Sequence, residues 1–172
     1  MRGEILAPPC PIFRTFRSSD ANVIAQHYNK NLTKPDNIWC ATSGPVSPAY
    51  IKLHRLALKA RGSILDQVHE DETGFLSYFI GTKKNDTASF SMGVVNLDHP
   101  QPMDLLRKDT ALFMKNLLNM GINKLRITGS SDQGSYVDWM EQEVKMKRVG
   151  KNNLWIADRN TLKSYVEKTL SI

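Results

Sequence analysis

The chain has 172 residues, and its 23 lysines and arginines exceed 17 aspartates and glutamates, giving a formal net charge of +6. A chain of about 150 residues can bury roughly two-thirds of its unfolded surface around one core, so the length predicts a single domain. Hydrophobic residues make up 41% and recur throughout, which excludes a disordered protein, and no apolar run approaches the about 20 residues of a membrane span.

The N-terminal residues MRGEILAPPCPIF contain three prolines and no continuous apolar core of the about 7–15 residues that a secretory signal needs. We therefore expect a cytoplasmic protein (host cytoplasm or virion, if viral), with residues 1–10 as an extension. Its two cysteines, Cys10 and Cys40, are expected to stay reduced. They exclude a disulfide scaffold, and with no histidine nearby they indicate no metal site.

Residues 11–17 alternate in polarity and predict a short strand. Ser18, Ser19 and Asp20 then supply N-cap oxygens for a helix through Tyr28. A second helix is expected from Pro48 to Arg61, with Ser47 as its cap and Pro48 in its first turn.

The middle of the chain is rich in predicted strands. Residues 63–69 alternate moderately, and an acidic loop follows at residues 70–72. Residues 74–82 are aromatic and β-branched, and the polar turn KKND separates them from a further run at 88–97. Two such runs joined by a short turn with Asn and Asp predict an antiparallel hairpin.

The clearest helix runs from Pro102 to Met120, where apolar residues recur at spacings of three and four. Gly121 is a suitable residue to end it, and a largely apolar strand follows at 122–129. A strand, a helix and a strand joined by short links form a βαβ unit. The strands at 88–97 and 122–129 are therefore predicted to be parallel.

The loop at 129–135 (GSSDQGS) leads into a helix predicted from Tyr136 to about Lys147. Glycines and hydroxyls before a helix can bind an anion, but neither phosphate fingerprint is present, which favours a plain loop capped by Ser135 or Ser131. A strand or hairpin is expected at 148–159. The predicted terminal helix reaches Leu170, is capped by Asn160 or Thr161, and packs on the domain as residues 160–172.

This order of elements resembles the GCN5-related N-acetyltransferase (GNAT) fold over about residues 11–159. The segment VKMKRVGKNNLWI is also similar to the family phrase Gly-Phe-Lys-Arg-Val-Gly, with Lys145 at the first glycine and Met146 at the aromatic position. The resemblance implies a mixed α/β fold. Its central sheet would have antiparallel N-terminal strands and a βαβ unit, with helices on both faces.

The resemblance also implies a cofactor site where the strand at 88–97 parts from the strand at 122–129. Acetyl-CoA would enter there, and its amide arm would pair with the backbone of Val94, Val95, Asn96 and Leu97. No metal is implied.

The pyrophosphate of that cofactor would rest on the loop before the long helix, which reads NLDHPQPMDLLRKD. The family has glycines there, whereas this loop has none, and its prolines lack N–H groups. Asp98 and Asp104 add negative charge that repels a phosphate, which Arg107 and Lys108 offset in part. The sequence therefore predicts that the ordinary cofactor site is absent or rebuilt.

The sequence also lacks the usual catalytic residue of the family at its expected position. Members of the family commonly use a tyrosine of the fourth helix as general acid, but Glu141 stands at that spacing and Tyr136 is the available substitute. Enzymes of the family often have a carboxylate or a histidine near the fourth or fifth strand as general base, and Asp98 or His99 is the candidate for that role here. The alternatives are a polar loop for Asp98 and His99, and an aromatic residue packed at a helix start for Tyr136.

The first functional hypothesis is a GNAT-fold protein with a degenerate cofactor site. It would be a non-catalytic interaction or structural component, for example of a bacteriophage, that binds a protein partner. The missing glycines and the missing tyrosine favour it. Its contact residues would be Trp39, Trp139 and Trp155, although tryptophan more often packs in a core.

Two alternatives remain open. The second hypothesis is an acetyl-CoA-dependent N-acetyltransferase with a divergent phosphate loop, in which the acidic residues 70–72 attract a cationic amine substrate. The third is a nucleic-acid-binding module that uses Lys52, Arg55 and Lys59 of the helix at 48–61. Its binding would be weak, non-specific and sensitive to salt.

Overall fold

The computed structural model describes residues 12–34, 44–129, 135–151 and 153–171. Some predicted features lie outside these residues: the extension at 1–10, Cys10, Trp39, Cys40 and Ser131.

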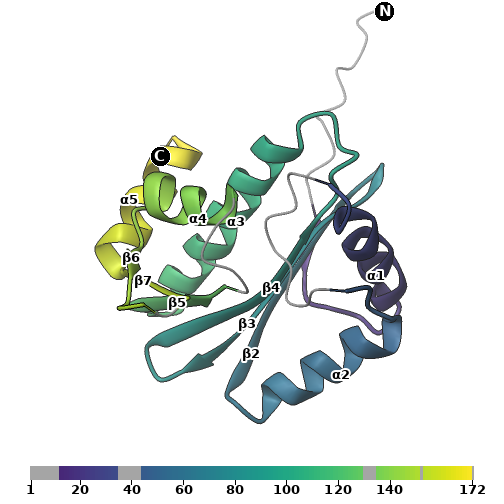
Figure 1. Cartoon of the computed structure of the whole chain (residues 1–172), viewed down its shortest axis with the longest axis horizontal. Helices are drawn as coiled ribbons and strands as arrows, with labels where there is room; N and C mark the ends of the chain where they lie inside the picture. Colours follow the sequence, from purple (N-terminus) through teal and green to yellow (C-terminus); the bar gives the residue numbers. More distant parts are fainter. Residues whose placement is uncertain (1–11, 35–43, 130–134, 152, 172) are drawn as a thin grey trace, which may run out of the picture.

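The described residues form a seven-stranded sheet in the order β1-β2-β3-β4-β5-β7-β6 (Figure 1). The strands are β1 (Ile12–Arg14), β2 (Ser63–Asp71), β3 (Gly74–Lys84), β4 (Thr87–Val95), β5 (Lys124–Thr128), β6 (Lys147–Arg148) and β7 (Leu154–Asp158). Neighbouring strands are antiparallel except β4 and β5, which are parallel. The predicted hairpin, the βαβ unit and the mixed sheet are therefore confirmed.

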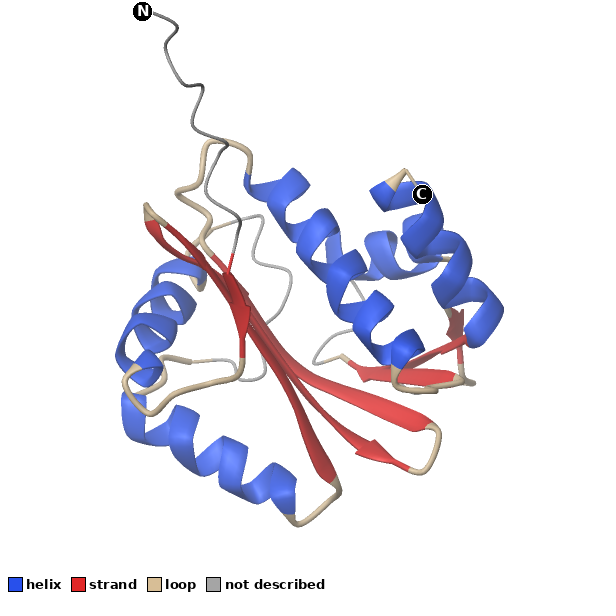
Figure 2. Ribbon diagram, turned by 180° about the vertical axis from the view of Figure 1, so that it is seen from behind, coloured by secondary structure: helices blue, strands red, loops and turns tan. Residues whose placement is uncertain are grey.

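Helices cover both faces of the sheet. They are α1 (Asp20–Asn31), α2 (Pro48–Lys59), α3 (Pro102–Asn119), α4 (Ser135–Asp138), the π-helix η1 (Trp139–Val144) and α5 (Arg159–Leu170). Helices α1 and α2 lie on one face, whereas α3, α4, η1 and α5 lie on the other (Figures 1 and 2). Each set encloses its own apolar cluster, and β3 contributes side chains to both clusters.

Local signals explain several helix ends. The Ser47 side chain accepts a hydrogen bond from the Tyr50 N–H (3.1 Å), which confirms it as the cap of α2. Helix α3 is followed by Gly121, whose φ of +79° is the left-handed conformation that glycine adopts without steric cost.

Other local predictions were right about the element but wrong about its bounds or its cap. Strand β1 has three residues. Ser19 makes no side-chain cap, because its backbone is already helical (φ −66°, ψ −22°) whereas a capping residue is extended. The Asp20 carboxylate accepts the Arg17 N–H (2.6 Å). The cap of α5 is Asp158, which accepts the Thr161 N–H (2.8 Å). The predicted fourth helix is one short α-helical turn followed by η1.

Lys145 ends η1 with a φ of +66°, a left-handed conformation that favours glycine. This is the position at which the similar family phrase has glycine. The structure therefore places a lysine in the conformation that the family's glycine suits, and the buried Met146 follows it.

Two of the expected contact tryptophans lie in the interior. Trp139 is 3% exposed and Trp155 is 0% exposed, so neither can contact a partner, and that expectation was wrong for both. Of the helices in the described parts of the chain, none combines the length and apolar character that crossing a bilayer requires.

Candidate functional site

Strands β4 and β5 run side by side for four residues and then diverge. The parallel register pairs Thr87 with Lys124 and ends with Phe90 opposite Ile127. Strand β4 continues to Val95 beyond the last of these pairs. The two strands therefore part at their C-terminal ends, as Figures 1 and 2 show.

A β-bulge marks the point of divergence. In the register with β3, Met92 pairs with Ile80 and Phe90 pairs with Gly81, so Ser91 is an extra residue of β4. Bulges bend a strand and re-aim its backbone. Ser91 therefore stands at the position where β4 turns away from β5.

Beyond the bulge, β4 presents backbone groups to the gap. The Asn96 N–H bonds to the Leu76 carbonyl of β3 (2.8 Å). Because hydrogen bonds alternate along an antiparallel pair, Gly93 and Val95 direct their N–H and C=O groups away from β3. The Val95 carbonyl already accepts the Asn31 side-chain amide (2.7 Å), which leaves the Val95 N–H and the Gly93 carbonyl for a ligand.

Asp98 follows in the loop before α3 and binds two lysines of the α1 region. It accepts hydrogen bonds from Lys30 and from Lys34 (2.7 Å), which lower the pKa of Asp98 to about 2. One carboxylate and two ammonium groups leave a net charge of +1. The repulsion expected between Asp98 and a pyrophosphate is thus reversed in sign.

Arg107 turns away from the loop. Its guanidinium binds the Glu143 carboxylate of η1 through two nitrogens (2.9 and 3.0 Å) and lies 3.6 Å from Asp104. The hydrogen bond to Glu143 raises the pKa of Arg107. Lys108 lies with Arg107 at a pocket of about 560 Å³ between α3 and α5.

Tyr136 reaches the end of β5. Its ring packs edge-on against Trp155 (5.9 Å between centroids). Its hydroxyl lies so close to Gly129, which directly follows β5, that a Cβ at residue 129 would be 2.2 Å from the oxygen. The Tyr136 hydroxyl is therefore at the divergence of β4 and β5, in a space that the absence of a side chain at Gly129 creates.

The other sequence candidates have local partners. The His99 Nδ1 accepts the Gln101 N–H (3.1 Å), which shapes the loop. Glu141, at the spacing of the family tyrosine, accepts the Trp155 indole N–H (2.8 Å).

Sequence reasoning missed His54, on α2. Its Nε2 lies 2.9 Å from the Ser91 hydroxyl at the bulge, and its ring stacks on Tyr50. Burial, with a smaller contribution from Arg61, lowers the pKa of His54 below 6.5, so the imidazole is neutral at pH 7. Thirty-seven residues separate His54 from Ser91, and no local pattern connects them.

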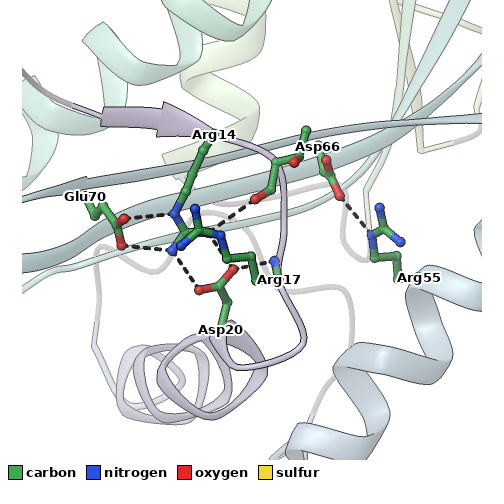
Figure 3. Close-up of polar contacts among 7 residues, drawn as sticks. Arg14, Arg17, Asp20, Arg55, Asp66 and Glu70 are labelled. Carbon is green, nitrogen blue, oxygen red and sulfur yellow. Dashed lines mark hydrogen bonds and ion pairs between the residues drawn. The ribbon is translucent and has the colours of Figure 1, made fainter.

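Two of the acidic residues 70–72 have partners of their own. Arg14 binds both Glu70 and Asp20 in a charged cluster (Figure 3). The Asp71 carboxylate accepts the Thr73 N–H and hydroxyl within the β2–β3 turn.

Two further observations concern charged residues elsewhere. Arg55 of α2 is bound to Asp66 (2.8 Å), so one of the three cations of the nucleic-acid hypothesis is already paired. Within the described residues, no three His, Cys, Asp or Glu side chains converge as metal ligands would.

No protein-family model and no curated protein matches the sequence. Solved structures do match the fold. FdhC, a nucleotide-linked sugar GNAT, superposes with a TM-score of 0.67 at 10% identity, covering 96% of each chain. RimJ from Mycobacterium smegmatis, in complex with CoA-disulfide, gives 0.65 at 12% identity over 94% of this chain and 88% of its own.

The GNAT-superfamily phosphinothricin acetyltransferase from Sinorhizobium meliloti, in complex with acetyl-CoA, gives a TM-score of 0.59 at 11% identity. It covers 86% of this chain and 88% of its own. Identities this low establish the architecture only. Together with the divergence of β4 from β5, these matches show that the chain has the fold of the GNAT acetyltransferases.

Proposed function

We propose that this protein is an acetyl-CoA-dependent N-acetyltransferase. The observation that carries the proposal is the divergence of β4 and β5, with the Val95 N–H directed into the gap and the Tyr136 hydroxyl at the end of β5. Two structures with the same fold are complexes with acetyl-CoA or CoA-disulfide, which supports the same cofactor here.

The residues present fit such a cofactor. The Val95 N–H and the Gly93 carbonyl can pair with an amide arm, since neither is used by β3. The loop at 96–101 lacks glycine. However, Lys30 and Lys34 bind Asp98 of this loop and so place positive charge beside it. Acetyl-CoA, when bound, supplies the activated acyl group.

Three side chains can move the protons of the reaction. Ser91 can pass a proton from the incoming amine to Nε2 of His54, which is neutral and within hydrogen-bond distance. Tyr136 can hold a proton at its hydroxyl and donate it to the leaving sulfur. Asp98 is a weaker base than His54, because its two lysine partners hold its pKa near 2.

The test begins with binding. Acetyl-CoA at 100 times its dissociation constant adds about 2.7 kcal/mol to the free energy of unfolding, so we expect the melting temperature to rise by about 5 °C or more. Val95→Pro removes the N–H and should abolish the rise. Val95→Ala keeps the N–H and should preserve it. Release of free thiol in the presence of amines then measures acetyl transfer.

The second candidate is the non-catalytic protein. It is favoured by the loop without glycine and by the pairing of Arg107 with Glu143, which leaves that guanidinium unavailable to a phosphate. No stabilisation by acetyl-CoA, and no thiol release with any amine, would establish this candidate over the enzyme.

A further inference from the structure

A second feature lies on the α2 face of the sheet, next to Ser91. It is a cleft of about 580 Å³, a volume within the usual range of small-molecule sites. Three positive side chains line it: Arg61 after α2, Lys84 at the end of β3, and Arg126 in β5. We name it the cationic cleft.

Within the part of the chain that the structure describes, no acidic side chain neutralises the charge of the cationic cleft. Among the described residues that line it there is no carboxylate, and none of the three cations forms an ion pair with the described carboxylates. Arg14, Arg55 and Arg107, by contrast, are each bound to one or more acidic side chains. Uncompensated positive charge in a concave site attracts anions.

Hydroxyl groups accompany the cations. Thr87, Ser89 and Ser91 alternate along β4 and line the cationic cleft, as does Thr128 at the end of β5. Hydroxyls and guanidinium groups are suitable hydrogen-bond donors to phosphate and carboxylate oxygens. The lining therefore matches an oxyanion better than an apolar or cationic group.

The position of the cationic cleft connects it to the reaction. Ser91 is the bulge residue and Thr128 ends β5, so the cleft reaches the point where the strands part. We infer that the acceptor is an amine that also carries a phosphate or carboxylate group. Arg61, Lys84 and Arg126 bind the anion while Ser91 and His54 meet the amine. This inference rests on the proposed acetyl transfer.

A nucleic acid is a less suitable occupant. Helix α2, beside the cationic cleft, exposes Leu53 (63%) and Leu56 (57%) between its lysines, and apolar side chains contribute nothing to phosphate binding. Arg61, Lys84 and Arg126 also converge on one cleft rather than following a strand or helix, which suits a small anion.

The first experiment measures binding without cofactor, by isothermal titration with glucosamine 6-phosphate, glucosamine, glutamate, putrescine and inorganic pyrophosphate. We expect the phosphate-bearing or carboxylate-bearing probes to bind and the two simple amines not to bind. Comparing the affinities of the phosphate-bearing probes with that of glutamate shows which anion the cleft prefers. Lys84→Gln with Arg126→Gln should weaken binding about tenfold or more.

A matched control removes the same number of charges elsewhere. Lys83 points to the opposite face of β3, where its Nζ donates to the Met120 carbonyl (3.3 Å), and Lys163 lies on α5 near Glu167 (3.7 Å). Lys83→Gln with Lys163→Gln should leave binding unchanged. If this control weakens binding as much as the cleft variant does, the effect is one of net charge and the inference is overturned.

The second experiment measures acetyl transfer to the same amines, and its outcomes separate the two proposals. Anion binding that depends on Lys84 and Arg126, with no stabilisation by acetyl-CoA and no acetyl transfer to any amine, would overturn the proposed function and keep the anion site. Equal transfer to glucosamine and glucosamine 6-phosphate would overturn the anion site and keep the function. Binding of a DNA duplex through Lys84 and Arg126, with no binding of small anions, would also overturn the inference.

Discussion

The Nδ1 atom of His69 lies 2.6 Å from Oδ2 of Asp109, inside the layer between the sheet and α3. The Ser77 hydroxyl donates to the same oxygen (2.6 Å), and Asp109 is 0% exposed. In a serine nucleophile activated by a histidine, the hydroxyl lies against the histidine. Here Ser77 and His69 instead contact the same oxygen of Asp109, so these three residues do not form such an arrangement. Its role is to connect α3 with β2 and β3.

Removing the carboxylate should therefore destabilise the fold. Asp109→Ala leaves His69 and Ser77 buried without their acceptor, and loss of one partner of a buried pair costs about 3–5 kcal/mol. Urea denaturation at pH 7 measures the change. The double variant Asp109→Leu with His69→Leu should recover part of the loss, since apolar side chains can replace a buried pair. A change below about 1 kcal/mol in Asp109→Ala would contradict the role.

Arg14 forms the corresponding connection on the other face. Its side chain is 14% exposed and binds Asp20 of α1 and Glu70 of β2, each through two hydrogen bonds (Figure 3). Arg14→Met should lower the free energy of unfolding by about 3 kcal/mol, because two carboxylates lose their partner. Arg14→Lys keeps the charge but not the planar fork, so it should recover only part of this loss.

The Arg14 variants should also differ in their response to acid. The hydrogen bonds from Arg14 lower the pKa of Glu70. For Asp20, burial is the largest single influence and raises the pKa, but the hydrogen bonds and charges of Arg14 and Arg17 together bring the pKa below its ordinary value. A carboxylate with a lowered folded-state pKa contributes stability that is present above its unfolded value and lost as the pH falls through the folded value. Wild type should lose more stability than Arg14→Met when the pH falls from 6 to 3. Equal losses would show that Arg14 is not the cause.

Local signals in the sequence were sufficient for the elements that position the gap. The apolar stripe of α3, its glycine stop and the KKND turn depend on neighbouring residues. The turn predicted the antiparallel hairpin correctly, and the helix between two strands predicted the parallel pair correctly. The partners of the candidate residues were not predictable in this way. Lys30 and Asp98 are 68 residues apart, so only the folded chain shows that this carboxylate is neutralised.

The same limit applies to the cationic cleft. Arg61, Lys84 and Arg126 belong to separate elements, and each is an ordinary surface cation in the sequence. The pairing of β2 with β3, of β3 with β4 and of β4 with β5 is what brings them to one cleft.

The contact between Gly129 and Tyr136 allows a test of the general acid. Tyr136→Phe removes only the hydroxyl and should lower kcat about 100-fold or more, as expected for a group that transfers a proton, while acetyl-CoA binding stays unchanged. Gly129→Ala should lower kcat as well, because its methyl would meet the Tyr136 oxygen at 2.2 Å and displace it. Unchanged kcat in Tyr136→Phe would exclude this residue as the acid.

The pH dependence of acetyl transfer tests the general base. His54 accepts a proton only when neutral, and burial lowers its pKa below 6.5, so kcat/KM should fall on the acid side with an apparent pKa under that value. His54→Gln should remove this acid limb and lower the plateau, and Ser91→Ala should lower the plateau without removing the limb. His99→Gln is the informative comparison, because His99 lies in the loop that follows β4. If the limb disappears in His99→Gln and persists in His54→Gln, then the base is His99, and the neutral imidazole of α2 has only a packing role beside Ser91.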